Sequence, residues 1–151
     1  MRRTTAAIVG ALMVLPLLAA CSGGSGDPDR PLQVAVGDGS LRAVGDDCAG
    51  TAPYRHIHAG AEVVLTDAAG NEAFRATLAP GTASEASDID FEQTPRIPTI
   101  CVFTLDAGDL AGDETYDVVI GDKAHGSFTY RPEAEGIPTI LIPEPATKGT
   151  P

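Results

Sequence analysis

The sequence predicts an all-β fold, an antiparallel β-sandwich of about seven strands. Three observations support this prediction. Apolar and polar residues alternate at period two in seven short segments, 17 Gly and 12 Pro supply frequent turns, and no stretch after Cys21 shows a helical stripe. With 151 residues a single domain is expected, and a hydrophobic content of 43% is too high for a wholly disordered chain.

The predicted strands follow from the positions of the alternating apolar residues. In the first, Leu32, Val34 and Val36 alternate with polar or small residues and precede a Gly-Asp-Gly turn. In the third and fourth, two alternating runs flank the turn at residues 67–70. The seven predicted segments are residues 32–36, 41–44, 61–66, 74–78, 101–105, 116–120 and 128–130.

One tyrosine bears on the topology. The run Asp113-Glu114-Thr115-Tyr116-Asp117-Val118 resembles the start of the sixth strand in immunoglobulin-like sandwiches, where a tyrosine hydroxyl bonds backbone a few residues upstream. The alternative is an ordinary half-buried strand tyrosine. The cysteines do not occupy antibody positions and Trp is absent, so we expect an Ig-like or transthyretin-like sandwich and not a true antibody domain.

The N-terminal residues predict an export signal. Arg2 and Arg3 precede an apolar run at residues 6–20 that is too short to span a bilayer. The following Leu18-Ala19-Ala20-Cys21 resembles the lipobox of bacterial lipoprotein precursors. That resemblance implies a signal peptide at residues 1–20, a diacylglycerol on the Cys21 sulfur and cleavage before it. The alternative is an ordinary secretory signal, with Cys21 incidental.

The lipobox resemblance also implies a location and a partner. Each buried CH₂ contributes about 0.8 kcal/mol, so two or three acyl chains such as palmitate would hold the protein on the extracytoplasmic face of the cell membrane. A Gly/Ser-rich tether, within residues 21–31, would separate the domain from the lipid. The net charge of −11 excludes nucleic acid as a partner and leaves any envelope protein partner unspecified.

The other two cysteines predict a disulfide. In an exported protein Cys48 and Cys101 would pair, and the chain-entropy treatment assigns about 4 kcal/mol to the loop they close. The alternative is two buried free thiols. No C-x-x-C motif is present, which leaves no basis for redox catalysis or a Cys-rich zinc site.

Two further segments each allow a structural interpretation and a binding interpretation. Residues 79–98 are predicted to be a long, solvated, acidic excursion between strands, although Asp88, Asp90 and Glu92 offer oxygen ligands for Ca²⁺ without matching an EF-hand. Residues 132–151 form a Pro-rich tail in which Ile140, Leu141 and Ile142 would add an edge strand or cover a sheet edge. The alternative for the tail is an exposed strand that binds a partner protein.

Catalytic signals are few. His56 and His58 would share one face of an extended segment and, with a carboxylate, hold zinc or copper, but His125 cannot be placed beside them from sequence. No nucleophile elbow or phosphate loop is present. We therefore expect no enzyme, no cofactor, and no catalytic or metal residues. The alternative is an envelope metal-binding protein or hydrolase that uses His56 and His58.

A wider similarity completes the sequence picture. The two cysteines at positions 48 and 101, the glycines between them and the Ala, Gly, Asp and Pro bias are similar to those of small envelope lipoproteins of high-GC Gram-positive bacteria. This resemblance covers residues 32–130 and implies a fold and a location but no activity. The expected organisation is a signal peptide (1–20), a lipidated Cys and tether (21–31), a β-sandwich (32–131) and a tail (132–151). We expect a non-enzymatic binding or structural module.

Overall fold

The computed structural model describes residues 30–87 and 94–142, and these form ten strands and no helix. Within these two ranges, accordingly, no helix is long and apolar enough to cross a membrane. The strands are β1 (Pro31–Val36), β2 (Leu41–Arg42), β3 (Asp47–Cys48), β4 (Glu62–Thr66), β5 (Glu72–Thr77), β6 (Gly81–Glu85), β7 (Ile97–Asp106), β8 (Glu114–Ile120), β9 (Lys123–Tyr130) and β10 (Thr139–Ile142).

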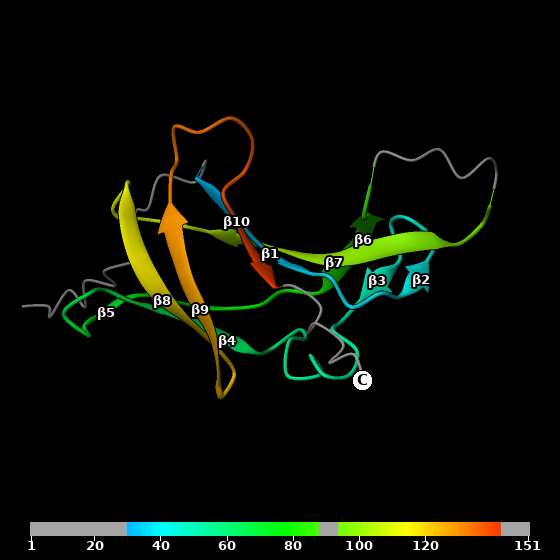
Figure 1. Ribbon diagram of the computed structural model, residues 1–151, viewed down its shortest axis with the longest axis horizontal. Coiled ribbons are helices and arrows are strands. Elements are labelled where there is room, and N and C mark those ends of the chain that lie inside the picture. Colours follow the sequence, from blue (N-terminus) through cyan, green and yellow to red (C-terminus); the bar gives the residue numbers. More distant parts are fainter. Residues whose placement is uncertain (1–29, 88–93, 143–151) are drawn as a thin grey trace, which may run out of the picture.

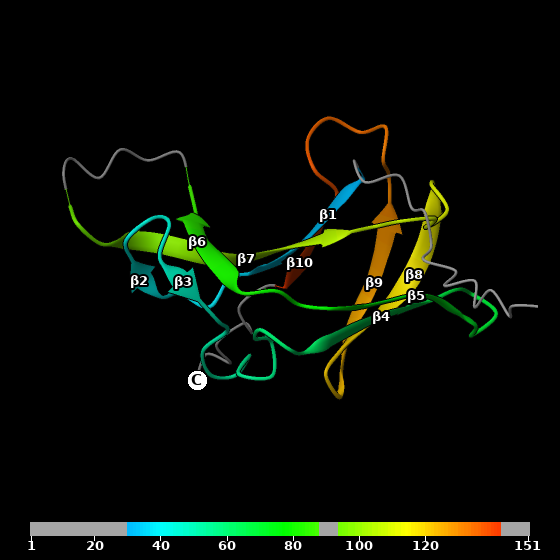
Figure 2. The same ribbon diagram turned by 180° about the vertical axis from the view of Figure 1, so that it is seen from behind.

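The strands form two sheets (Figures 1 and 2). The six-stranded sheet has the order β10-β1-β7-β6-β3, with β2 paired beside one end of β7, and the four-stranded sheet has the order β5-β4-β8-β9. All described pairings are antiparallel except that of β1 with β10. The prediction of an all-β, sandwich-like fold is confirmed. Figure 1 shows β7 running between the end that carries β2, β3 and β6 and the end near β8.

The core lies where the inward faces of the two sheets meet. Along β7, Cys101, Phe103 and Leu105 are buried and alternate with more exposed neighbours, as period-two patterning requires. The same alternation buries Val63 and Leu65 on β4. Burial of each large side chain contributes about 1.5–3 kcal/mol. Other fully buried core side chains are Leu32, Val34, Val36, Ile57 and Ile120.

The seven predicted segments correspond to β1, β2, β4, β5, β7, β8 and β9. The prediction of a strandless excursion over residues 79–98 was wrong, because β6 lies inside it and β7 begins there. The inward residues of β6 are only Gly81 and Ala83, so the segment carries almost no apolar alternation. The two-residue strand β3 was also missed, because a segment that short has no detectable period.

Tyr116 makes the hydrogen bond that the sequence suggested. Its hydroxyl donates to the backbone carbonyl of Ala111 over 3.0 Å, and the residue is buried at the beginning of β8. Burial of the phenol, together with the charge of Glu114, raises the pKa of Tyr116. The bond fixes the connection between β7 and β8 to the core.

The tail contributes to the six-stranded sheet. Residues 139–142 form β10, which pairs in parallel with β1, so the sheet extends to Ile142. Ile140 and Ile142 face the core while Leu141 is 63% exposed. β10 is therefore an edge strand, and Pro143, which follows it, has no N–H to extend the pairing.

Candidate functional site

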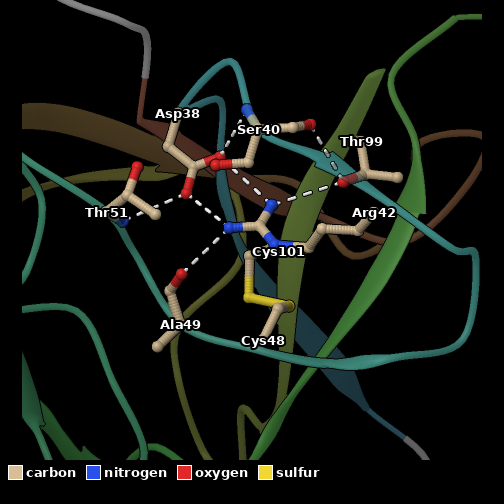
Figure 3. Close-up of a disulfide and its surroundings, with 8 residues drawn as sticks. All are labelled: Asp38, Ser40, Arg42, Cys48, Ala49, Thr51, Thr99 and Cys101. Carbon is tan, nitrogen blue, oxygen red and sulfur yellow. Dashed lines mark hydrogen bonds and ion pairs between the residues drawn. A yellow bond between two sulfur atoms is a disulfide. The ribbon is translucent and has the colours of Figure 1, made fainter. Parts of the chain in front are cut away.

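Cys48 and Cys101 form a disulfide, as predicted (Figure 3). It joins β3 to β7, two strands of the same sheet that both flank β6. The two Cα atoms are 5.8 Å apart, whereas two strands separated by a third lie about 10 Å apart in a flat sheet. The sheet is therefore strongly curled at β6, and the disulfide closes this curl.

Gly81 on β6 makes the disulfide sterically possible. It is paired with Cys48, and a Cβ atom at this position would lie 2.7 Å from the Sγ atom of Cys101 and 2.7 Å from Cε1 of Phe103. Real Cβ atoms do not approach neighbours so closely. Only glycine fits under the bridge without displacing the core.

A buried carboxylate lies next to the disulfide (Figure 3). The side chain of Asp38 has no exposed surface and accepts hydrogen bonds from Nη2 of Arg42 at 2.7 Å and Nη1 of Arg42 at 3.1 Å. The backbone N–H groups of Thr51, at 3.0 Å, and Ser40, at 3.2 Å, donate to the same carboxylate. Burial opposes ionisation, but these donors outweigh it and lower the pKa of Asp38 to about 2.

Arg42 extends this cluster to both cysteine-bearing segments. Its guanidinium donates to Oγ1 of Thr99 over 3.3 Å and to the carbonyl of Ala49 over 3.2 Å. Ala49 follows one cysteine directly and Thr99 precedes the other by two residues. We define Asp38, Arg42 and the disulfide as the bracing cluster, because its hydrogen bonds are directed at the protein's own backbone and side chains.

A second polar pair links the connection between β3 and β4 to β9. Nε2 of His56, in this connection, is 2.8 Å from Nε2 of His125, near the start of β9. The ring planes differ by 9° and the centroids are 5.0 Å apart. Atoms of rings packed face to face stay about 3.5 Å or more apart, so a 2.8 Å contact requires edge-to-edge rings in nearly one plane. The two Nε2 atoms therefore point at each other.

The local sequence explains why His56 and His58 diverge. Their side chains would share a face only in an extended segment, and residues 49–61 instead form turns, bends and irregular backbone. Ile57 is completely buried, and its N–H and carbonyl bond to Tyr54 and Gly50. His58 is exposed, with Nδ1 2.8 Å from the carbonyl of Ala59. The structure brings His56 to His125, a contact between residues 69 positions apart that sequence alone does not reveal.

Both paired histidines are shifted toward the neutral form. Burial is the main cause of the lowered pKa of His56, and the charge of Lys123 adds to it while Asp122 opposes it. Burial likewise lowers the pKa of His125, followed by the charges of His56 and Lys123. A shared hydrogen bond needs one Nε2–H donor and one unprotonated Nε2 acceptor, which fits two neutral rings.

The other edge of the His56 ring is unusual. Its Nδ1 atom is buried and makes no hydrogen bond of acceptable geometry, although the carbonyl of Pro53 favours a proton on this ring. A buried polar atom without a partner carries an energetic cost of about 1–3 kcal/mol. The described residues contain no group of three or more His, Cys, Asp or Glu side chains arranged for a metal ion.

The surface is hollowed near the start of β1. Arg30 lies over the ring of Tyr130, 5.3 Å from its centroid, and donates to the carbonyl of Gly108 over 3.1 Å. Pro132 and Pro138 line the same hollow. The cation–π contact and the hydrogen bond fix the point at which the chain enters the sheet at β1.

Several residues singled out from the sequence lie outside the described ranges. These are Cys21, which the sequence analysis expects to carry lipid, and the three acidic residues considered for calcium, Asp88, Asp90 and Glu92. Comparison with protein-family models, curated protein sequences and solved structures finds no match to this chain.

Proposed function

We propose that this chain is a lipid-anchored envelope protein, held through Cys21 on the extracytoplasmic face of the cell membrane. Its β-sheet body would act as a non-enzymatic binding or structural module. The observation that carries the proposal is the order of the features along the chain: a lipobox at Leu18-Ala19-Ala20-Cys21, a Gly/Ser tether and then a disulfide-bonded all-β body.

The disulfide supports export. Disulfides persist in oxidising compartments and are rare in the cytosol, so a bridge between Cys48 and Cys101 fits a protein that works outside the cytoplasm. The spacing between the proposed anchor and the domain also fits an anchored module. The first strand begins at Pro31, ten residues after Cys21, so a short tether would connect the lipid to the β-sheet body. A chain with net charge −11 would be repelled by an anionic leaflet and stand away from it.

The buried ion pair supports a structural or binding role for the domain. The buried charges of the bracing cluster, Asp38 and Arg42, are neutralised by each other and hydrogen-bonded to the chain's own loops. Within the all-β class, we assign the body to Ig-like or transthyretin-like sandwiches. The Tyr116 hydrogen bond at the β7–β8 connection supports this assignment, because such a tyrosine closes a corner in Ig-like domains.

Replacement of the lipobox cysteine tests the proposal. Full-length protein with Cys21→Ala should remain unprocessed or leave the membrane fraction, whereas Ser22→Ala, the adjacent matched control, should fractionate as wild type. Membrane fractionation and the electrophoretic mass of both variants in the source organism or a close surrogate measure this. Unchanged processing and unchanged membrane association of Cys21→Ala would disprove lipidation at that residue.

A further inference from the structure

We propose that His56 and His125 form a two-histidine binding site for a copper(I) ion. The proposal rests on the in-line arrangement of their Nε2 atoms, which lie 2.8 Å apart in nearly coplanar rings. It is independent of the lipid anchor, and it replaces the pairing of His56 with His58 that the sequence suggested. The same geometry also permits simple sharing of a proton, which the test below separates from copper binding.

The orientation of the rings suits two-coordinate copper(I). Imidazole nitrogen is a common copper ligand, and each metal–nitrogen bond is about 2 Å long. An ion placed on the line between the two Nε2 atoms therefore needs them about 4 Å apart, about 1 Å more than in the proton-sharing pair. His125 is only partly buried near the start of β9, and the proposal requires its side chain to rotate there by enough to open this space.

The position of His56 limits movement on the other side of the site. Its backbone carbonyl and Cβ lie against Gly121, in the turn between β8 and β9. The neighbouring Ile57 is completely buried and fixes the loop. Nδ1 of His56 is buried, so Nε2 is the ring nitrogen directed toward His125. The loop and the hairpin therefore present two nitrogen donors from segments that are far apart in sequence.

The proton balance is simple and involves no redox step. In the metal-free neutral pair one Nε2 carries a proton and the other accepts it. When copper(I) binds both Nε2 atoms, that proton moves through solvent to Nδ1 of the same ring, and both imidazoles remain neutral ligands. Two copper–nitrogen bonds form in place of one N–H···N hydrogen bond.

Copper(I) titration of the full-length protein in detergent tests the site. A colorimetric copper(I) chelator serves as competitor, with ascorbate as reductant because it does not cleave disulfides. We expect one ion per chain and a loss of affinity of more than about tenfold in His56→Ala and in His125→Ala, since second-shell changes alone cost that much. His58→Ala, an exposed histidine in the same loop, should bind copper(I) within about twofold of wild type.

X-ray absorption of the copper-loaded protein distinguishes the histidine pair from the sulfur atoms of the chain. Two nitrogen neighbours and no sulfur neighbour support the proposal. Sulfur neighbours, equal loss in His58→Ala, or no copper(I) bound above the level of the His56→Ala/His125→Ala double variant would each overturn it. Thermal unfolding of every variant accompanies the titration. If His56→Ala does not fold, the result with His125→Ala decides, because His125 lies on β9, outside the loop that the buried Ile57 fixes.

Discussion

The bracing cluster and the histidine pair both contact the loop at residues 49–61, the first through Ala49 and Thr51 and the second through His56, but they use polar groups differently. In the bracing cluster Asp38 receives four hydrogen bonds and Arg42 contacts two further segments. In the histidine pair the two rings share one hydrogen bond between their Nε2 atoms, and Nδ1 of His56, on the far edge of its ring, is buried. A saturated cluster stabilises the fold, whereas the histidine pair has two nitrogen atoms held together by a single shared hydrogen bond that a metal ion could replace.

The largest expected effect comes from removing the disulfide. The double variant Cys48→Ala/Cys101→Ala should lower the free energy of unfolding by about 4 kcal/mol, because the bridge restricts the unfolded chain. Denaturant unfolding measures the loss, and Cys21→Ala, which leaves the bridge intact, is the control. A loss below about 1 kcal/mol would contradict the role assigned to the bridge.

Next in size is the removal of the buried carboxylate. Asp38→Ala should cost about 3 kcal/mol, since it leaves the Arg42 guanidinium, itself 13% exposed, without its partner. Asp46→Ala, at an exposed position in the neighbouring turn, should change stability by less than about 0.5 kcal/mol. Equal effects of the two substitutions, measured by denaturant unfolding, would show that the Asp38 cluster is not a brace.

The same carboxylate predicts an acid-dependent loss of stability. The pKa of Asp38 is depressed from 3.8 to about 2 in the folded protein, so its stabilising contribution is complete above pH 3.8 and is lost as the pH falls toward 2. The loss should be about 2 kcal/mol by unfolding at a series of pH values. Asp38→Asn should remove this part of the pH dependence, and an unchanged slope in that variant would contradict the assignment.

A smaller effect is expected from the tyrosine corner. Tyr116→Phe keeps the buried ring but removes the hydroxyl that bonds the carbonyl of Ala111, which should cost about 1 kcal/mol. Tyr130 is also buried, so the change in the free energy of unfolding caused by Tyr130→Phe can be compared with that caused by Tyr116→Phe. If Tyr116→Phe unfolds at the same denaturant concentration as wild type, the hydroxyl does not hold the corner.

The smallest stability effect is expected at the histidine pair. His125→Ala should lower the free energy of unfolding by about 0.5 kcal/mol, because the side chain is only partly buried and makes one neutral hydrogen bond. Thermal unfolding without metal measures this. A loss as large as that of Asp38→Ala would mean that the pair is a second structural brace and would remove the contrast between the two regions.

Much of the fold could be predicted because its signals are local. Period-two alternation along β4 and β7 reports which side chains face the core. Assigning Cys21 to the expected lipid leaves Cys48 and Cys101 with only each other as disulfide partners. The strand β6 was not predicted because its inward residues, Gly81 and Ala83, are too small to give an apolar alternation, and at Gly81 the nearby disulfide leaves no room for a larger side chain.

The histidine pair could not be predicted because it depends on a distant contact. His56 and His58 suggested a shared face only if their segment were extended, and the burial of Ile57 within a turn removes that condition. The partner, His125, lies on a hairpin whose position beside this loop is set by the packing of the two sheets. Sequence spacing carries no information about that packing.

The most direct test of the central proposal is the intact mass of the protein isolated from its native membrane. We predict a chain that begins at Cys21 and carries the added mass of a diacylglycerol thioether, with or without an N-terminal acyl chain. A chain that begins elsewhere, or one that begins at Cys21 without acyl mass, would contradict the lipid-anchored account.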